Sequence, residues 1–248
     1  MTGKKLWIGT SGWSYDGWKA GFYAGVPRRR WLQHCAEHFD GVEVNMTFYR
    51  IPKASTLEKW RDETPPGFRF AIKAWRAITH LKKLHDVDEM IATQRQSLLP
   101  LKEKISVILW QLPSGLHGDP ELLKHFIDAL RPWRDAPHAF EFRHTSWFQS
   151  ETLACLEEAG IANVISHAAR WPMWDAVSGK LVYIRLHGAP ETYASAYSDE
   201  DLGFWAARIR QWLDEKRTVH VYFDNDALGH APYDALKLRD RIAGAPGK

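Results

Sequence analysis

The chain has 248 residues, of which 45% are hydrophobic and 25% are charged, and its formal net charge is +3. This composition is typical of a folded globular protein and excludes a low-complexity chain or a strongly basic, histone-like one. The two cysteines, Cys35 and Cys155, lie in segments with a helical pattern, which favours a reduced, cytoplasmic compartment over a disulfide framework. We expect no signal peptide and no contact with a membrane, because residues 1–5 lead into a strand pattern and no apolar run has membrane-spanning length.

Eight segments have the length and the residue types of β-strands. In chain order they are Leu6–Trp13, Gly41–Phe48, Arg69–Trp75, Ser106–Leu112, His138–His144, Ala162–His167, Leu181–His187 and Thr218–Asn225. Helical patterns separate most of them, and strands that alternate with helices form parallel βα units. Eight such units in about 250 residues predict an α/β fold, a single (β/α)8 barrel of the TIM type, as one domain over residues 1–248.

Several local signals place the ends of the predicted helices. Asp119 precedes Pro120 at the start of one helix, and Ser198 with Asp201 has the spacing of a capping box at the start of another. Gly160 stands where a left-handed residue would end a helix. Residues 167–180 have no helical period, so we expect the sixth unit to be irregular, and residues 1–5 and 244–248 to be frayed.

The strand segments carry ionisable residues between apolar ones, as in Val42-Glu43-Val44 and Phe140-Glu141-Phe142. Because side chains alternate between the two faces of a strand, the apolar residues should pack on helices while the polar ones point into the barrel. The residues expected to point inward are Glu43, Asn45, Lys73, Gln111, Glu141, Arg143, Arg185, His187, Tyr222 and Asp224. Most lie late in their strands, at the end where barrel enzymes have their active sites. We expect the charged members to form one hydrogen-bonded network.

A set of short motifs resembles a known family. They are Gly9-Thr10-Ser11-Gly12-Trp13-Ser14-Tyr15, Val42-Glu43-Val44-Asn45, Gln111-Leu112-Pro113, Glu141-Phe142-Arg143-His144 with Ser146-Trp147, Arg185-Leu186-His187-Gly188 and Tyr222-Phe223-Asp224-Asn225. Together they resemble the YecE-like family, a domain of unknown function, over almost the whole chain. The resemblance implies a (β/α)8 barrel and no particular reaction. A remote likeness of that fold to barrel-type apurinic endonucleases suggests nucleic-acid or phosphate-ester chemistry by analogy alone.

Three carboxylates, Glu43, Glu141 and Asp224, are the candidate catalytic groups, as general acids and bases. The alternative is an internal salt-bridge network with Lys73 and the two arginines. A cluster of this size at a barrel mouth favours a functional site. We expect no Ser or Cys nucleophile, because Ser11 and Ser14 lack the spacing of a nucleophile elbow and neither cysteine lies at a strand end.

The candidate substrate-binding groups are polar and aromatic. Arginine can bind carboxylate or phosphate with two hydrogen bonds, and tryptophan faces can stack on a sugar or a base. The full set is Asn45, Lys73, Gln111, Arg143, His144, Arg185, His187, Tyr222, Asn225, Trp13 and Trp147. The histidines near strand ends, at positions 80, 144, 167 and 187, include no pair with His-x-x-x-His spacing, and nearby cations would repel a divalent ion. We therefore expect no metal and no cofactor at the mouth.

The leading hypothesis is an enzyme, a hydrolase or a lyase, that uses acid–base chemistry on a polar or anionic small molecule or a sugar-like one. Glu43 and Glu141 would transfer protons, while Lys73 and the arginines would hold negative charge. One rival is a phosphodiesterase or nuclease, which the slight net charge supports poorly. The other is a binding protein for an anionic metabolite, with the same cations but without a carboxyl of raised pKa. The sequence leaves the oligomeric state open.

Overall fold

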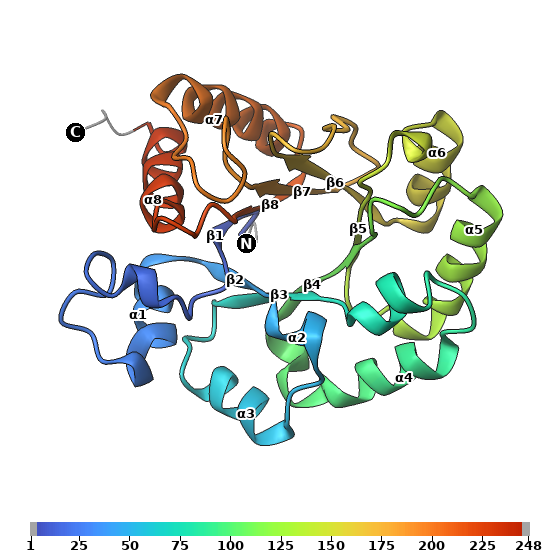
Figure 1. The fold of residues 1–248 in the computed structure, drawn as a ribbon, viewed down its shortest axis with the longest axis horizontal. Helices are drawn as coiled ribbons and strands as arrows, with labels where there is room; N and C mark the ends of the chain where they lie inside the picture. The colour runs from blue at the N-terminus through green and yellow to red at the C-terminus, as the bar shows by residue number, and fades with distance from the viewer. Residues whose placement is uncertain (1–3, 245–248) are drawn as a thin grey trace.

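Eight parallel strands form a closed barrel in the computed structural model, which describes residues 4–244 (Figure 1). The strands are β1 (Leu6–Ser11), β2 (Gly41–Val44), β3 (Arg69–Lys73), β4 (Ile105–Gln111), β5 (His138–Glu141), β6 (Ala162–His167), β7 (Leu181–Leu186) and β8 (Thr218–Phe223). Each strand pairs with its neighbours in sequence, and β1 closes the barrel by pairing with β8. The predicted (β/α)8 barrel is confirmed. The fraying expected at the chain ends falls largely on residues 1–3 and 245–248, which lie outside the described residues.

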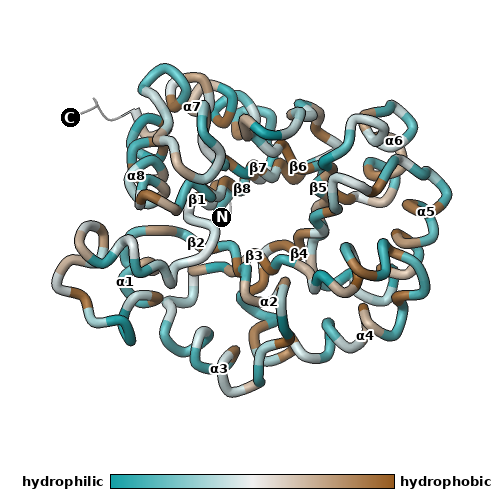
Figure 2. Tube along the Cα trace, viewed as in Figure 1, coloured by the Kyte–Doolittle hydropathy of each residue, from teal (hydrophilic) through white to brown (hydrophobic). Residues whose placement is uncertain are grey.

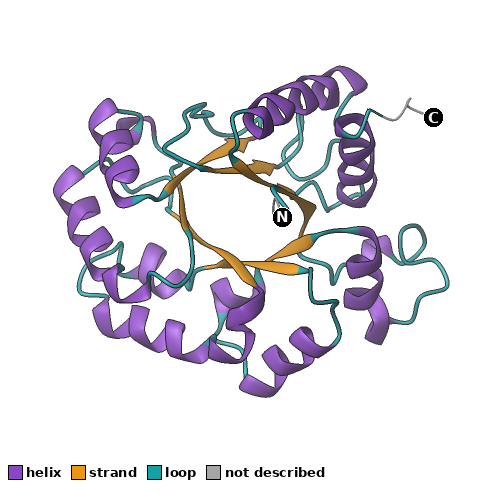
Figure 3. Ribbon diagram, turned by 180° about the vertical axis from the view of Figure 1, so that it is seen from behind, coloured by secondary structure: helices purple, strands orange, loops and turns teal. Residues whose placement is uncertain are grey.

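Helices surround the strands on all sides, as Figure 3 shows from behind. They are α1 (Trp31–His38), α2 (Met46–Tyr49), α3 (Ala54–Asp62), α4 (Asp88–Ser97), α5 (Pro120–Ala129), α6 (Ser150–Ala159), α7 (Asp199–Asp214) and α8 (Ala231–Ile242). Within residues 4–244, no helix has the length and apolar character needed to cross a membrane.

The predicted helix ends are confirmed by their hydrogen bonds. The Asp119 carboxylate accepts a bond from the Leu122 amide at 3.0 Å and caps α5. Ser198 and Asp201 form a reciprocal capping box at the start of α7. Gly160 ends α6 with φ +68°, a conformation that glycine adopts without strain.

Two apolar layers lie on the two sides of the strands. The larger one, between strands and helices, holds the alternating residues predicted to point outward, such as Val42, Phe140 and Ile184. The smaller one fills the barrel interior with small and aromatic side chains, among them Ala71 and Tyr183. Figure 2 shows brown, apolar stretches along several of the strands. The interior core lies below the polar residues at the strand ends and supports them.

Strand β6 has its predicted bounds, whereas the other strands end earlier than predicted. The largest differences are at β2, predicted to reach Phe48, and at β5, predicted to reach His144. After β2 the chain turns into α2, where the Thr47 hydroxyl donates to the backbone carbonyls of Val44 and Lys73 at 2.9 and 2.7 Å. Phe48 therefore lies in a helical turn and not in an extended strand. The sixth unit is irregular over residues 168–180, as predicted.

Candidate active site at the carboxyl end of the barrel

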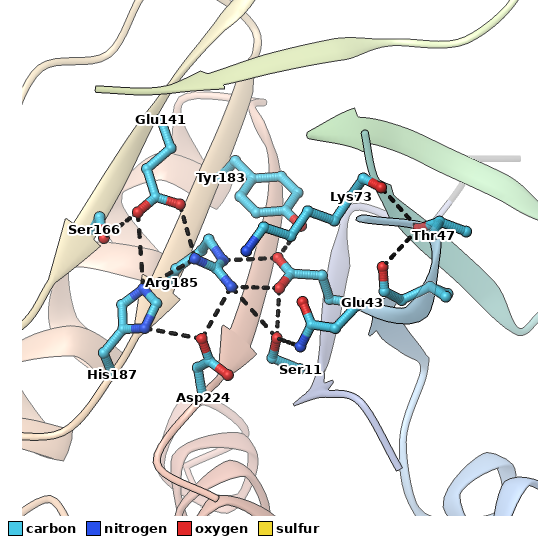
Figure 4. A network of polar contacts seen from close by, with 12 residues as sticks. Ser11, Glu43, Thr47, Lys73, Glu141, Ser166, Tyr183, Arg185, His187 and Asp224 are labelled. Carbon is cyan, nitrogen blue, oxygen red and sulfur yellow. Dashed lines mark hydrogen bonds and ion pairs between the residues drawn. The ribbon is translucent and has the colours of Figure 1, made fainter. Parts of the chain in front are cut away.

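The guanidinium of Arg185, near the end of β7, lies at the centre of a buried polar network (Figure 4). Its Nε and Nη2 donate to the two Glu43 oxygens at 2.8 and 2.6 Å. Its Nη1 donates to Glu141 at 2.8 Å, and its Nη2 also donates to Asp224 at 3.0 Å. Arg185, Glu43 and Glu141 are at most 1% exposed. One cation thus links three carboxylates that come from different sides of the barrel.

Glu43 is held by further donors from β1 and β7. The Ser11 hydroxyl donates to one of its oxygens, and the Tyr183 hydroxyl donates to the other at 2.7 Å. The Asn45 amide in turn donates to Ser11 Oγ at 2.9 Å. Burial and the Glu43 charge raise the pKa of Tyr183 well above its usual value, so this phenol remains a donor. Glu43 is therefore fixed in position as well as paired.

Glu141, the last residue of β5, contacts a second arginine. Arg143 Nε donates to its Oε1 at 2.7 Å, and the Ser166 hydroxyl donates to the same atom at 3.0 Å. The Arg143 guanidinium also lies 3.8 Å from the ring centre of Trp171, whose Nε1 donates to Ser166 at 3.0 Å. This side of the network is thus covered by an aromatic ring from the irregular sixth unit.

His187 connects Arg185 with Asp224. Its Nε2 accepts a hydrogen bond from Arg185 Nη1 at 3.1 Å, and its Nδ1 lies 2.9 Å from Asp224 Oδ2 without the alignment of a hydrogen bond. Burial and then the Arg185 charge lower the pKa of His187. The ring is therefore neutral at neutral pH, with its proton on the nitrogen that faces Asp224.

Two of the carboxylates, Glu141 and Asp224, are ionised despite their burial. Burial alone would raise the pKa of Glu141, but Arg143 and Arg185 together hold it well below its usual range. Burial alone would also raise the pKa of Asp224, but Arg185 and His187 lower that pKa to about 2. The three carboxylates raise the pKa of Arg185, although burial opposes this. Glu141, Asp224 and Arg185 therefore keep their charges within the network.

Lys73, the last residue of β3, reaches the same region without joining the network. Within residues 4–244 its Nζ has no hydrogen bond and no carboxylate oxygen within 4.0 Å, and it lies 4.4 Å from the ring centre of Phe48 (Figure 4). Burial and the nearby Arg185 charge lower the pKa of Lys73 to about 8. The residue as a whole is partly exposed, and within residues 4–244 its amine has no carboxylate partner.

The groups that solvent can reach at this end are mainly basic. Lys73, His80 and Arg143 are partly exposed and Arg76 is exposed, whereas Glu43 and Glu141 are fully buried. Burial and the Lys73 charge lower the pKa of His80 to about 4, so His80 is neutral near pH 7. A ligand that enters the mouth therefore meets cations first, with the carboxylates beneath them.

A further carboxylate, Asp226, lies two residues beyond Asp224 and is partly exposed. Burial and the neighbouring Asp224 charge raise the pKa of Asp226 to about 6. Asp224 has a lowered pKa and Asp226 a raised one. Acid–base catalysis often uses such a pair, with one carboxyl ionised and the other protonated. Sequence reasoning missed Asp226, although its spacing from Asp224 was a usable signal.

Other missed residues are Ser11, Ser166 and Tyr183. Tyr183 shares the inward face of β7 with Arg185, and Ser166 shares a face of β6 with Val164, so period-2 alternation could have identified both. Trp171 lies in a loop, where no periodic pattern predicts which way a side chain points.

Three of the predicted binding residues serve local structure. The Gln111 amide donates to the Leu112 carbonyl at 3.1 Å. His144 bonds to Ser146 at 2.7 Å and accepts from its amide, so it caps the short helical turn over residues 145–147. Asn225 donates to Asp234 of α8 at 2.8 Å and thereby anchors the loop after β8.

Three predicted aromatic residues do not join the network either. Trp13 packs edge-on against Trp60 in the outer layer, with ring centres 5.1 Å apart. Trp147 is completely buried and stacks on Phe142 at 5.0 Å. Tyr222 does point into the barrel, but its hydroxyl lies 3.2 Å from His220 Nδ1 in the interior core. None of these rings is placed to stack on a ligand at the network.

Comparison with known proteins places this chain in a family. The family model described as "Protein of unknown function DUF72" matches residues 7–247. YecE of Escherichia coli K12 is 32% identical over 254 residues, which cover 92% of this chain and 89% of the relative. YunF of Bacillus subtilis is 26% identical over 269 residues, which cover 96% and 94%. This chain belongs to the DUF72 family, which confirms the resemblance to YecE.

Solved structures agree with this assignment. A DUF72 protein from Thermotoga maritima matches with a TM-score of 0.85 at 26% identity, over 96% of this chain and 99% of the other. A DUF72 protein from Enterococcus faecalis matches with a TM-score of 0.82 at 23% identity, over 98% and 97%. The family description names no reaction, so an activity has to be argued from the site itself.

Proposed function

We propose that this DUF72 protein is an enzyme that uses acid–base chemistry on an anionic small molecule at the carboxyl end of its barrel. The observation that carries the proposal is the Lys73 amine, which within residues 4–244 has no carboxylate partner although it lies beside a cluster of ion pairs. A lysine that lies in a largely buried environment without a carboxylate partner lowers the stability of the fold. Destabilising residues of this kind are found most often at functional sites.

The charges at the mouth favour an anionic substrate. Lys73, Arg76 and Arg143 are the reachable cations, and Arg143 is held rigidly between Glu141 and the Trp171 ring. A guanidinium fixed in this way retains outward-facing donors that can hold a carboxylate or phosphate group. Hydrolase or lyase chemistry, both of which need a proton donor or acceptor, is compatible with this arrangement.

Lys73 is a better proton-transfer group than Glu43 or Glu141. A general base works best with a pKa near the operating pH, and the pKa of Lys73 is about 8. Glu141 is held ionised by two arginines, and Glu43 is bonded to Arg185 through both oxygens. In this proposal the two glutamates position Arg185 and Arg143.

A binding protein for an anionic metabolite is the second candidate. It is favoured by the low pKa values of Glu141 and Asp224, which remove the obvious carboxylic acids from proton transfer. A nuclease or phosphodiesterase remains a prediction from analogy, without an observation at the mouth that favours it over a small-molecule enzyme.

Lys73→Met tests both candidates, with Lys59→Met at an exposed position of α3 as the control. Wild type and variants are incubated with a mixture of cellular metabolites, which is then analysed by mass spectrometry, and thermal shifts are recorded with inorganic phosphate and with mono- and dicarboxylates. Consumption of an anion by wild type and by Lys59→Met, but not by Lys73→Met, supports the enzyme. Binding that depends on Lys73 without any turnover supports the binding protein. Identical behaviour of all three proteins would reject the site.

A further inference from the structure

A separate cluster of ionisable side chains lies in the helical layer outside the barrel, on the last turn of α1. His34, Glu37 and His38 have i, i+3 and i+4 spacing, which places them on one face of the helix. One candidate ligand atom from each residue lies within 4.8 Å of the other two. We propose that these three residues bind one divalent transition-metal ion, with Zn²⁺ as the best match for two imidazoles and a carboxylate.

His38 is already set for coordination. Its Nδ1 lies 2.8 Å from the backbone carbonyl of His34, a contact in which only the protonated nitrogen can take part. The free lone pair is therefore on Nε2. A backbone carbonyl on the second ring nitrogen is the partner that metal-binding histidines commonly have. Arg239 of α8 donates to the His38 carbonyl at 2.6 Å and fixes the end of the helix.

The His34 ring is also held in place. It contacts the edges of Phe22 and Tyr23, with ring centres 4.9 and 5.7 Å away, and lies 4.3 Å from the His38 ring. Its Nδ1 lies 3.7 Å from a Glu37 oxygen. Because both rings are packed, little rotamer freedom is lost when an ion binds.

The residues next to the cluster determine which further groups could contact a bound ion. Cys35 is completely buried, with its thiol 3.0 Å from the Tyr23 hydroxyl, so it cannot become a ligand. Arg30 lies 3.9 Å from the exposed Glu37 carboxylate and would compete weakly with the ion. Three protein ligands on an exposed helix face leave the remaining coordination positions to water.

The order His-x-x-Glu-His occurs in one class of zinc peptidases, where two histidines of one helix bind zinc and the glutamate acts as a base. In this chain the glutamate is close enough to be a ligand itself. The proposal is therefore a binding site and not a peptidase. Sequence reasoning missed it because only histidines near strand ends were compared for spacing.

The experiment is a calorimetric titration of the untagged, chelator-treated full chain with Zn²⁺, repeated with Co²⁺ to record the absorption spectrum. The test variants are Glu37→Gln, which keeps an exposed side chain of the same shape, and His38→Gln. The matched control is His125→Gln on α5, since His125 makes the same 2.8 Å contact with the carbonyl four residues earlier but has no such cluster around it.

We expect one ion per chain for the wild type and for His125→Gln, and an affinity at least about tenfold weaker for each α1 variant, a loss that even an outer partner of a metal ligand can cause. The melting temperature of wild type should rise with Zn²⁺, and that of His38→Gln should not. Absence of a one-ion site in the wild type would overturn the proposal. Equal weakening in His125→Gln, or unchanged binding in both α1 variants, would overturn it as well.

Discussion

Replacing Arg185 with methionine removes the one cation that contacts all three buried carboxylates. After the change, Glu141 keeps its bond to Arg143, whereas Glu43 keeps only the hydroxyls of Ser11 and Tyr183. Removing one partner of a buried ion pair typically costs about 3–5 kcal/mol, because the other charge remains buried. For a chain of this size, such a loss lowers the melting temperature by roughly 6–20 °C.

The pH dependence of stability distinguishes the loss of the Arg185 charge from the loss of its packing contacts. In the wild type the pKa values of Glu141 and Asp224 are lowered, so their contribution to stability is complete above the unfolded pKa near 4 and is lost as the pH falls towards about 2, the folded value of Asp224. In Arg185→Met the same buried carboxyls should have raised pKa values. The stability that Arg185→Met loses relative to the wild type should therefore be largest at pH 8, and the loss should shrink as the pH falls towards about 4.

The assay is urea unfolding and thermal melting of both proteins between pH 4 and pH 8. Arg131→Met is the surface control, because Arg131 pairs with Asp128 at 2.7 Å with both side chains more than half exposed. We expect the control to lose at most about 1 kcal/mol. A deficit in Arg185→Met that is below about 1 kcal/mol, or that does not change with pH, would refute the electrostatic account and leave only a packing effect.

Lys73→Met should raise stability at pH 7 by at least about 1 kcal/mol, because a lysine whose folded pKa is below its unfolded value destabilises the fold until the pH rises through that range; an unchanged or lower melting temperature would contradict this. Lys104→Met should instead lower stability by about 2 kcal/mol or more. Burial lowers the pKa of Lys104 as well, but its amine donates to carbonyls that include Thr64 at 2.5 Å, and these would be left without a donor. Asp226→Asn should stabilise the protein at pH 8 by on the order of 1 kcal/mol and have no effect at pH 4, because the raised pKa of about 6 makes the ionised form costly in the folded state; melting curves at the two pH values decide. If Lys73 is the base, kcat/KM for an anion found in the metabolite screen should rise with pH up to about 8, and a profile that falls over this range would exclude that role.

The barrel and most of its buried network could be predicted from sequence because both follow from period-2 alternation. Glu43, Glu141 and Arg185 each lie between apolar residues that pack outward, which sends the charged side chain inward. Residues beyond the strand ends carry no such periodic signal. This is why Trp13 and Trp147 were assigned to the mouth although they pack elsewhere.

The choice between a salt-bridge network and a functional site also could not be made from residue types alone. Three carboxylates and three cations balance in number, so the composition of the mouth allows complete neutralisation. The distances show that the cations differ: Arg185 and Arg143 are bonded to carboxylates at 2.6–3.0 Å, while Lys73 has no such partner within 4.0 Å in the described chain.

A mouth that served stability alone would gain from pairing or removing that third cation. The network holds Arg185 and Arg143 in fixed geometry, whereas within the described chain Lys73 has no carboxylate partner and its pKa is lowered to about 8. The two interpretations of the charged strands therefore apply to different residues. The arginines and carboxylates form the salt-bridge network, and Lys73 carries the proposal of a functional site.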